Sequence, residues 1–226
     1  MLQGCFRIPF SKQREYDRRE NQASYSAGPD LMAMQPQMGQ RTTYGERFRN
    51  ISSEIGPGCK FGDDVFLGLG SIIGQGTWIG NRSKVWHFNN LIGYNRIGED
   101  CMIASYVQLD PRAEIGDRTR VQNYTAIASD CKVGSNCFIS LGVIFTNSKY
   151  PPSERLEPIV IGDGVIIGAH VTLLPGVRVG NGAVIDSGST VTKDIPSHEE
   201  WRGSPARFLR AREKYDALKA LWEDQI

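Results

Sequence analysis

The sequence lacks an excess of charge of either sign, and it lacks a long apolar run. Its 26 lysine and arginine residues nearly balance 25 aspartate and glutamate residues, which leaves a net charge of +1. That balance gives no indication of a nucleic-acid or membrane-surface partner. No stretch approaches the roughly 20 apolar residues that a membrane-spanning helix needs, and the first residues hold no hydrophobic signal region. We therefore expect a cytoplasmic protein without nucleic-acid or membrane partners.

Histidine is also scarce, which argues against a metal site. The three histidines are His87, His170 and His198. A tris-histidine zinc site needs all three to cluster. His87 and His170 could approach each other across subunits, but His198 falls in a segment that leaves the repeat described below. The sequence also has no spacing typical of zinc ligands, so we expect no metal. No catalytic serine triad or phosphate loop stands out either.

The most regular feature present is an apolar residue at every sixth position. At 40% apolar composition, sixteen successive matches have odds of roughly one in two million, so chance is excluded. This period fits neither a 3.6-residue helix nor an alternating strand, and it indicates a hexapeptide-repeat parallel β-helix. The series is Ile55, Phe61, Leu67, Ile73, Ile79, Val85, Leu91, Ile97, Ile103, Leu109, Ile115, Val121, Ile127, Val133, Ile139 and Phe145.

A small residue lies two positions before most of these apolar residues, and only Asn89 and Asn95 depart from the rule. Three six-residue sides make an 18-residue triangular coil, stacked about 4.8 Å above its predecessor. The long and small residues then fill a narrow prism together. Four of the five cysteines occupy the small position, where reduced cysteine behaves as a small hydrophobe: Cys59, Cys101, Cys131 and Cys137.

The rhythm stops after Phe145 and resumes at Ile161, continuing to Val191. The gap of sixteen residues contains ten more than the repeat requires, so a loop over residues 146–160 leaves the prism. Long loops in compact folds tend to be functional, although a tolerated surface insertion would leave the same pattern. With 22 apolar repeat positions in all, we expect about seven coils.

The remaining segments flank the prism. Residues 1–48 read as a partly disordered arm, residues 49–200 as the β-helix domain, and residues 201–226 as a C-terminal segment with an α-helix. The helix is predicted to begin near Pro205 and to cover the last coil. It carries an apolar stripe at helical spacing: Phe208, Leu209, Ala211, Tyr215, Leu218, Leu221 and Trp222.

Stacking arithmetic also predicts a polar column on one outer edge. Residues 18 apart lie above one another, which places His87 beneath Ser105 and Ser105 beneath Asn123. Trp86 and Tyr124 flank this column, and their rings could stack on a base or a sugar or simply contact a neighbouring subunit. His87 could equally be a catalytic residue or a hydrogen-bonding residue at a subunit interface.

Several motifs resemble one enzyme family. They are Val85-Trp86-His87-Phe88, Val121-Gln122-Asn123, Phe145-Thr146-Asn147 with Tyr150-Pro151, and the tail Val191-Thr192-Lys193-Asp194-Ile195-Pro196 with Gly203-Ser204-Pro205-Ala206-Arg207. The tail is similar to that of the hexapeptide-repeat acyltransferase superfamily, and the other motifs resemble bacterial N-acetyltransferases of nucleotide-linked amino sugars. The resemblance covers about residues 50 to 210. It implies a left-handed β-helix, a homotrimer, acetyl-CoA as co-substrate and a small-molecule acceptor.

The resemblance also suggests roles for individual residues. His87, or a water that it orients, would accept a proton, while Asn123 and Asn147 position the acceptor. Further acceptor contacts would come from Thr146, Tyr124 and Trp86. The acetyl-CoA contacts would be Gly142, Gly168 and Ala169 for the pantetheine arm and Lys193, Arg207 and Arg210 for the phosphates. A backbone N–H near Gly142 would stabilise the oxyanion.

Two alternatives stay open beside N-acetylation of a nucleotide amino sugar. The first is an O-acetyltransferase acting on a sugar or another small molecule. Several related O-acetyltransferases carry a catalytic histidine in or near their long loop, whereas this loop has Thr146-Asn147-Ser148 and no histidine. An amine nucleophile needs less help, because it loses its proton after attack. The second alternative is a non-catalytic β-helix scaffold, which would need neither the loop nor the tail motif.

Overall fold

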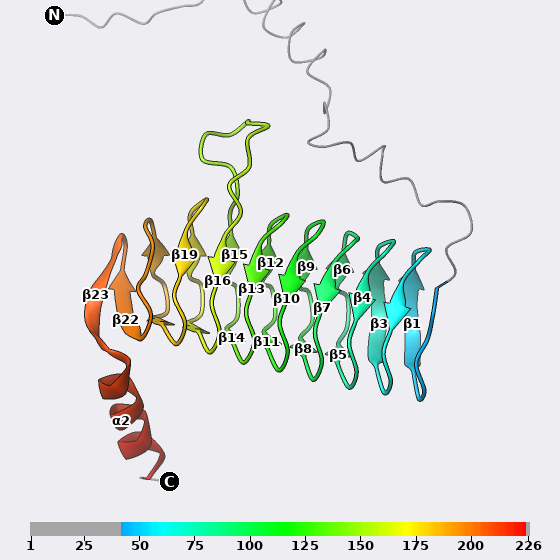
Figure 1. The fold of residues 1–226 in the computed structure, drawn as a ribbon, viewed down its shortest axis with the longest axis horizontal. Helices are drawn as coiled ribbons and strands as arrows, with labels where there is room; N and C mark the ends of the chain where they lie inside the picture. The colour runs from blue at the N-terminus through cyan, green and yellow to red at the C-terminus, as the bar shows by residue number, and fades with distance from the viewer. Residues whose placement is uncertain (1–41, 225–226) are drawn as a thin grey trace, which may run out of the picture. The chain divides into compact units, whose positions relative to one another are not determined.

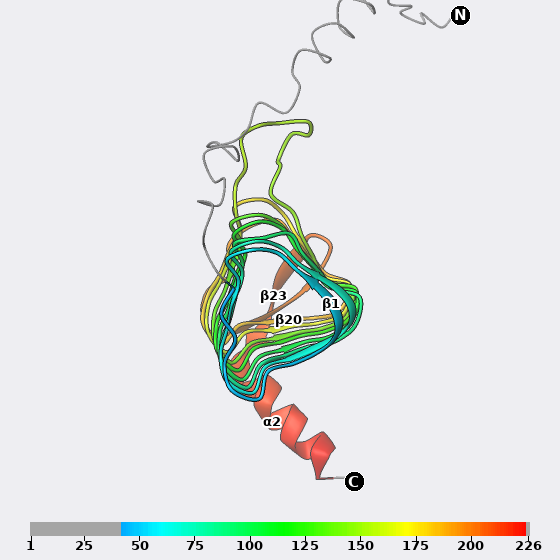
Figure 2. The ribbon, with the colours of Figure 1, turned by 90° about the vertical axis from the view of Figure 1, so that its right-hand side faces the viewer.

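The computed structural model describes residues 42–224, and those residues form a triangular parallel β-helix (Figures 1 and 2). Most of the predicted arm, residues 1–41, lies outside the described part of the chain. The first face of the prism is a seven-stranded parallel sheet. Its strands are β2 (Lys60–Phe61), β4 (Trp78–Ile79), β7 (Arg96–Ile97), β10 (Glu114–Ile115), β13 (Lys132–Val133), β16 (Val160–Ile161) and β19 (Arg178–Val179).

The other two faces share a continuous sheet, because β3 (Phe66–Ile73) bends from the second face to the third. The second face continues through β5 (Lys84–Val85), β8 (Met102–Ile103), β11 (Arg120–Val121), β14 (Phe138–Ile139), β17 (Ile166–Ile167), β20 (Val184–Ile185) and β22 (Glu199–Gly203). The third face continues through β6 (Asn90–Leu91), β9 (Gln108–Leu109), β12 (Ala126–Ile127), β15 (Ile144–Phe145), β18 (Thr172–Leu173) and β21 (Thr190–Val191). Before them, β1 (Arg49–Ile55) pairs with β3.

The register follows the sequence period. Ile115 pairs with Val133 and Val121 with Ile139, each 18 residues apart. Across the loop, Val133 pairs with Ile161, a separation of 28 residues, so the ten extra residues leave the next coil in register. Seven strands on the first face, with partial coils at both ends, confirm the prediction of about seven coils and an ejected loop.

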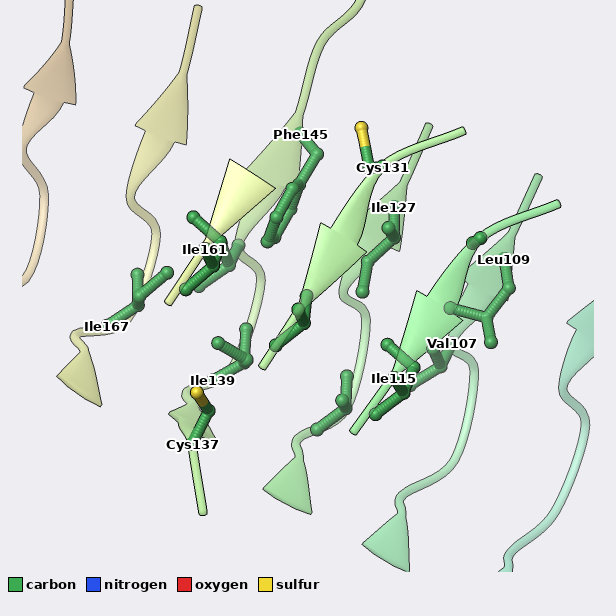
Figure 3. Close-up of a cluster of buried hydrophobic side chains, with 14 of the residues drawn as sticks. Val107, Leu109, Ile115, Ile127, Cys131, Cys137, Ile139, Phe145, Ile161 and Ile167 are labelled. Carbon is green, nitrogen blue, oxygen red and sulfur yellow. The ribbon is translucent and has the colours of Figure 1, made fainter. Parts of the chain in front are cut away.

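The interior is filled by the long and small repeat residues, as Figure 3 shows around Ile115, Ile139 and Cys137. Most polar residues at the small position bond to the backbone of the next coil, and the buried Thr77 hydroxyl is the exception without a partner in the described residues. The Ser83 hydroxyl donates to the Gly98 carbonyl over 2.7 Å. The two exceptional asparagines also bond to the backbone of the next coil. Asn95 Nδ2 donates to the Asp110 carbonyl over 2.7 Å, and the Val107 N–H donates to Asn89 Oδ1 over 2.8 Å. The buried side-chain amides of these asparagines therefore have hydrogen-bond partners.

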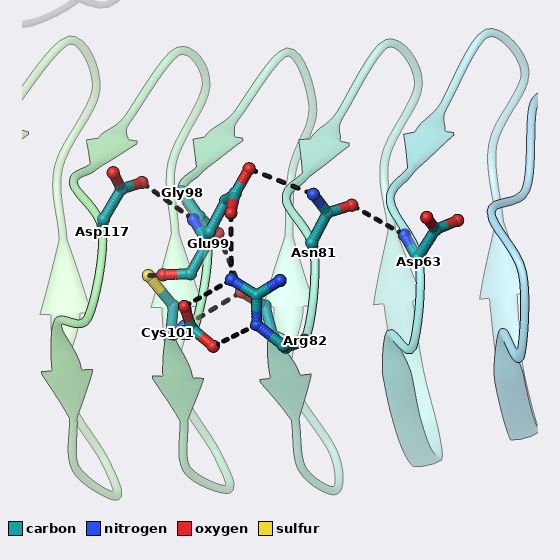
Figure 4. A network of polar contacts seen from close by, with 9 residues as sticks. Asp63, Asn81, Arg82, Gly98, Glu99, Cys101 and Asp117 are labelled. Atoms are coloured by element: carbon teal, nitrogen blue, oxygen red, sulfur yellow. Dashed lines mark hydrogen bonds and ion pairs between the residues drawn. The ribbon is translucent and has the colours of Figure 1, made fainter.

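Side chains stack outside the prism as well. On the edge between the first and second faces, Asp63 N–H donates to Asn81 Oδ1 over 2.8 Å, and Asn81 Nδ2 donates to Glu99 Oε1 over 3.1 Å (Figure 4). Arg82 beside them forms a two-pronged ion pair with Asp100. These vertical hydrogen bonds confirm that residues 18 apart lie one above another.

The C-terminal end differs from the prediction. The chain does not enter a helix near Pro205; it forms an antiparallel hairpin of β22 with β23 (Ala206–Ala211), and β22 extends the second face by pairing with β20. The hairpin covers the last coil with Trp201, which is 5% exposed. The helix α2 (Arg212–Glu223) follows and has no buried residue. It leads away from the prism, so the prediction that it covers the last coil was wrong.

Candidate functional site

The predicted polar column lies on the edge where the second face turns into the third. We call this edge the site corner; it comprises the short connections 86–89, 104–107, 122–125, 140–143, 168–171 and 186–189. His87, Ser105 and Asn123 each follow a strand of the second face by two residues. The pairing of Val85 with Ile103 and of Ile103 with Val121 places the three in one column, as the sequence predicts.

His87 is fixed by its two neighbouring coils. The Leu69 N–H donates to His87 Nδ1 over 2.9 Å, and the backbone N–H of His87 donates to Ser105 Oγ over 3.2 Å. A neutral imidazole whose Nδ1 accepts a hydrogen bond carries its proton on Nε2. In this arrangement His87 can donate from Nε2 but cannot accept a proton there. This geometry differs from the expected proton acceptor. The Trp86 ring contacts His87 edge-on, with 5.8 Å between ring centroids.

Backbone donors are unevenly distributed along the site corner. The amides of Gly142, Gly168 and Ala169 are already bonded, to the Asn123 carbonyl, the Ile185 carbonyl and Ser187 Oγ. The amides of Asn123 and Leu141 have no acceptor among residues 42–224. Leu141 and Ala169 have no side-chain acceptor to offer to the coil before them, and the Ser105 N–H is likewise unpartnered in the described residues, although Asn123 lies on the next coil. The sequence identified Gly142 and missed Leu141.

The two candidate asparagines lie on different corners. The Asn123 carboxamide is on the site corner, and Asn147 is on the loop corner, where the third face turns into the first. Neither carboxamide has a hydrogen-bond partner within the described part of the chain, and both residues are half-buried. One subunit therefore holds two available amides at opposite edges of its third face and does not bring them together.

The ejected loop is anchored at its base. Thr146 Oγ1 donates to the Leu173 carbonyl over 2.8 Å, so the hydroxyl proton of this candidate is committed to the prism. The Glu157 N–H donates to the Asn147 carbonyl over 2.7 Å, and the Gly176 N–H donates to the Glu157 carbonyl over 2.8 Å. Ser148, which sequence reasoning passed over, has a buried hydroxyl without a partner in the described residues. These bonds fix Asn147 in place while its carboxamide stays available.

The predicted phosphate-binding cations differ in availability. Arg210 is paired with Glu200 over 2.9 Å and its side chain is 24% exposed. Burial raises the pKa of Glu200, and Asp186 adds to this effect. The guanidinium of Arg210 stabilises the Glu200 carboxylate and is therefore not available to a ligand. Lys193 lies over the Trp201 ring, 5.0 Å from its centroid. Arg207 is exposed, forms no ion pair among residues 42–224, and follows the hairpin turn.

That hairpin turn lies beside the site corner. The Gly203 N–H donates to Ser189 Oγ over 3.0 Å, and Ser204 Oγ donates to Thr190 Oγ1 over 2.9 Å. The tail motif is thus held against the last turn of the same edge that carries His87 and Asn123. Arg207 is the predicted cation best placed to serve a ligand along this edge.

Two shallow grooves lie on the first face instead. One, of about 340 Å³, is lined by Trp78, Arg96, Glu114 and Lys132 among others. The other, of about 450 Å³, includes Arg178, Asn181 and Asp194. Neither contains a predicted site residue. The described residues include no group of three metal-ligating side chains that could hold an ion, and no helix among them has the length and apolarity to cross a membrane.

Comparison with known proteins places these features in a family context. Residues 158–193 match the model described as bacterial transferase hexapeptide (six repeats), and residues 60–85 match the hexapeptide repeat of succinyl-transferase. The chain is 31% identical over 148 residues to the bifunctional protein GlmU of Clostridium botulinum, which covers 66% of this chain and 30% of that protein. It is 32% identical over 120 residues to serine acetyltransferase 2 of Arabidopsis thaliana, covering 52% and 36%.

The fold is shared with solved structures. A UDP-N-acetylglucosamine acyltransferase superposes with a TM-score of 0.66 at 21% identity, covering 81% of this chain and 78% of the other. The corresponding enzyme from Moraxella catarrhalis gives a TM-score of 0.56 at 18% identity, with 79% and 76% covered. At these identities the likeness establishes the fold. This chain spans about a third of the length of the curated relatives it matches.

Proposed function

This chain belongs to the hexapeptide-repeat superfamily, and from that premise we propose that it is an acyltransferase that acetylates the amino group of a nucleotide-linked amino sugar with acetyl-CoA. The observation that carries the proposal is the set of unpartnered amides on the site corner. The Asn123 carboxamide and the backbone N–H groups of Asn123 and Leu141 have no partner among residues 42–224 and lie on neighbouring coils of the same corner. Available polar groups held on a rigid scaffold are suited to bind a ligand.

Acetyl-CoA is proposed to lie along the site corner, with a phosphate near Arg207. The edge is narrow at Gly142, Gly168 and Ala169, and the N–H groups of these three residues are already bonded. The pantetheine amides would therefore pair with backbone carbonyl groups or with the N–H groups of Asn123 and Leu141. Lys193 flanks the same end, whereas Arg210 stabilises the cap. The thioester carbonyl then comes within reach of the Asn123 and Leu141 amides.

The proposed chemical step is direct attack. The neutral amine of the acceptor attacks the thioester carbon, and the developing oxyanion is stabilised by the Asn123 and Leu141 N–H groups. Collapse of the intermediate breaks the carbon–sulfur bond and releases CoA as a thiolate, which takes up the proton that the amine loses. His87 contributes a hydrogen bond from Nε2 rather than a base, and it positions the acceptor.

A neighbouring subunit completes this site in the proposal. Asn147 lies at the opposite edge of the third face from Asn123, so a homotrimer that sets two prisms side by side would bring the loop corner of one subunit to the site corner of the next. Asn147, Thr146, Tyr124 and Trp86 would then line one cleft for the sugar nucleotide. The acceptor identity rests on the motif resemblance and on the sugar-nucleotide acyltransferases that share the fold.

The test is turnover by a paired variant. Asn123→Ala combined with Asn147→Ala should abolish CoA release from acetyl-CoA in the presence of amino-sugar nucleotides while leaving assembly intact, as judged by light scattering. Asn136→Gly is the matched control, because Asn136 lies on another corner, has a φ of 57° that glycine tolerates, and its carboxamide bonds only to Arg118 among the described residues. Near-normal turnover in the paired variant would contradict the site.

O-acetylation is the second candidate, and one comparison favours it. The match to a serine acetyltransferase is as strong in identity as the match to GlmU. A hydroxyl nucleophile needs a base, and His87 would first have to give up its bond from the Leu69 N–H. The same turnover assay with hydroxyl acceptors, serine and uridine diphosphate sugars, separates this candidate from N-acetylation.

A further inference from the structure

The site corner carries a column of aromatic rings. Phe88, Tyr106 and Tyr124 occupy equivalent positions on three successive coils. Their rings stack, with centroids 5.4 Å apart at 19° for Phe88 and Tyr106 and 5.2 Å apart at 6° for Tyr106 and Tyr124. We call these three residues the ring column. The Phe88 ring leans toward the preceding coil, since two of its carbons lie 2.7 Å from the position that a Cβ of Gly70 would occupy.

The column is interrupted above Tyr124. The next coil has Gly142 at this position and the coil after it has His170, whose Nδ1 lies 2.6 Å from the position of a Cβ on Gly142. His170 thus covers Gly142, as Phe88 covers Gly70, and one ring position between Tyr124 and His170 has no side chain. With coils about 4.8 Å apart, this slot separates the flanking rings by about 10 Å, enough for one planar ring.

Backbone geometry does not require glycine at the slot. Gly142 has a φ of 68°, but Phe88, Tyr106, Tyr124 and His170 adopt 56°, 60°, 61° and 55° at the equivalent position. The backbone at residue 142 therefore accepts a side chain, but an added Cβ would lie 2.6 Å from His170 Nδ1, so the imidazole would have to shift. Without a side chain at residue 142, no ring from that coil covers Tyr124. Tyr124 is 58% exposed, the highest value in the column.

The edge of the slot is polar. Asn123 precedes Tyr124 and has an unpartnered carboxamide, while the N–H groups of Asn123 and Leu141 are left for the thioester oxygen. Stacking faces above and below, with hydrogen-bonding groups at the side, are the combination that recognises a nitrogen heterocycle.

We propose that this slot binds the nucleobase of a nucleotide ligand, stacked between Tyr124 and His170 and beside Gly142. The inference rests on the proposed function, because both of its substrates contain a nucleobase: the acceptor nucleotide and the adenine of CoA. The slot chemistry is common to both sources. Which of them enters is decided by the experiment.

The experiment fills the slot from the protein side. Uridine 5′-diphosphate, thymidine 5′-diphosphate and adenosine 3′,5′-bisphosphate are titrated by calorimetry into the full-length protein and into Gly142→Phe, which supplies the missing ring. Gly142→Asn is the matched control, since asparagine tolerates a positive φ and leaves the slot without a ring. Gly142→Phe should weaken the nucleotide that the wild type binds by about tenfold, in line with the loss of base stacking.

A second pair of variants acts on the platform. Tyr124→Leu should weaken the same nucleotide about tenfold, whereas Tyr124→Phe should keep its affinity within about twofold, because the phenyl face stacks as well. If the variants lose affinity only for the two pyrimidine nucleotides, the acceptor is the source of the nucleobase. If they lose affinity only for the adenosine bisphosphate, the source is CoA. If Gly142→Phe does not fold, the Tyr124 pair decides alone.

The proposal is overturned if the wild type binds none of the three nucleotides, or if Gly142→Phe and Tyr124→Leu bind them as the wild type does. Acetyl transfer is measured in parallel with the wild type. A protein that binds a nucleotide in the slot but shows no transfer from acetyl-CoA refutes the proposed function and keeps the slot. A protein that transfers acetyl groups with unchanged kinetics in both slot variants refutes the slot alone.

Discussion

At the scale of single residues, the four inward cysteines show how the prism treats a reactive side chain. All four are buried, and Cys59, Cys101 and Cys137 donate their thiols to backbone carbonyls. Burial raises the pKa of Cys101 and Cys131 to about 11, and it raises those of Cys59 and Cys137 as well. A thiol of this kind is a core residue and not a nucleophile.

The thiols should therefore resist alkylation. With a folded-state pKa above the ordinary value of 9.0, Cys101 and Cys131 stay protonated in the folded protein as pH rises through 9. Their contribution to stability is full below about pH 9 and is lost progressively as pH rises from 9 to about 11. Iodoacetamide labelling of the native protein, read by peptide mass spectrometry at pH 8, should leave all four unmodified, with full labelling in guanidinium as the control. Rapid labelling of Cys101 in the folded protein would contradict the structure.

His87 is the residue for which sequence and structure differ most. Its place in the column follows from the 18-residue coil alone. Its hydrogen bond from Leu69 does not, because ring rotation depends on the amide of the coil below, which no residue pattern encodes. The unpartnered N–H of Leu141 was missed for a related reason. It has no acceptor because Ala169, at the equivalent position of the next coil, has no polar side chain.

The two roles of His87 differ in the size of the effect on turnover. As a hydrogen-bond donor, His87→Ala should lower kcat by about tenfold and destabilise the fold by about 1–3 kcal/mol, because the Leu69 N–H loses its acceptor. Removal of a general base costs about 100-fold to 10,000-fold instead. Steady-state kinetics together with denaturant unfolding measure both quantities. A loss of about 1,000-fold in kcat without a loss of stability would show that His87 acts as a general base.

At the scale of elements, the C-terminal cap was the part of the fold that sequence reasoning misread. Phe208, Leu209 and Ala211 continue the apolar spacing of the helix, so the pattern gave no boundary before Arg212. In the structure these residues belong to β23, because β22 finds an open strand edge at β20. The repeats were predictable because each coil repeats one local rule, whereas the cap depends on a single tertiary pairing.

Two tryptophans distinguish cap from helix. Trp201→Ala should destabilise the protein by about 3–5 kcal/mol, since its ring is 5% exposed and closes the last coil. Trp222→Ala on α2 is the matched control and should change the free energy of unfolding by less than about 0.5 kcal/mol, because its residue is 66% exposed. Chemical denaturation of both variants checks this. Equal losses would mean that the helix and not the hairpin covers the coil.

The ejected loop can be removed without breaking the repeat. Deleting residues 149–158 restores the six-residue spacing between Phe145 and Ile161 and keeps Asn147. Two backbone hydrogen bonds are lost, through Glu157, so the free energy of unfolding should fall by only about 1–3 kcal/mol. Acetyl transfer should be lost, because the loop is proposed to complete the cleft. Unchanged turnover in the shortened protein would make the loop a tolerated insertion.

At the scale of the whole molecule, the proposed site depends on assembly. The amides of Asn123 and Asn147 lie at the two edges of one face, so the proposed cleft exists only between subunits. Light scattering should give about 75 kDa, three times the chain mass of 25.1 kDa. A monomer with full acetyltransferase activity would contradict the two-subunit cleft.

The most direct test of the account is the thermal stability of the purified protein with acetyl-CoA and, in parallel, with a set of nucleotide sugars that includes 3-amino sugars. A ligand that binds only the folded state raises the melting temperature, and a concentration of about 100 times Kd adds about 2.7 kcal/mol of stability. We expect a rise in melting temperature with acetyl-CoA and with a nucleotide amino sugar. No rise with any acyl-CoA at about 1 mM would contradict it and leave the prism a scaffold.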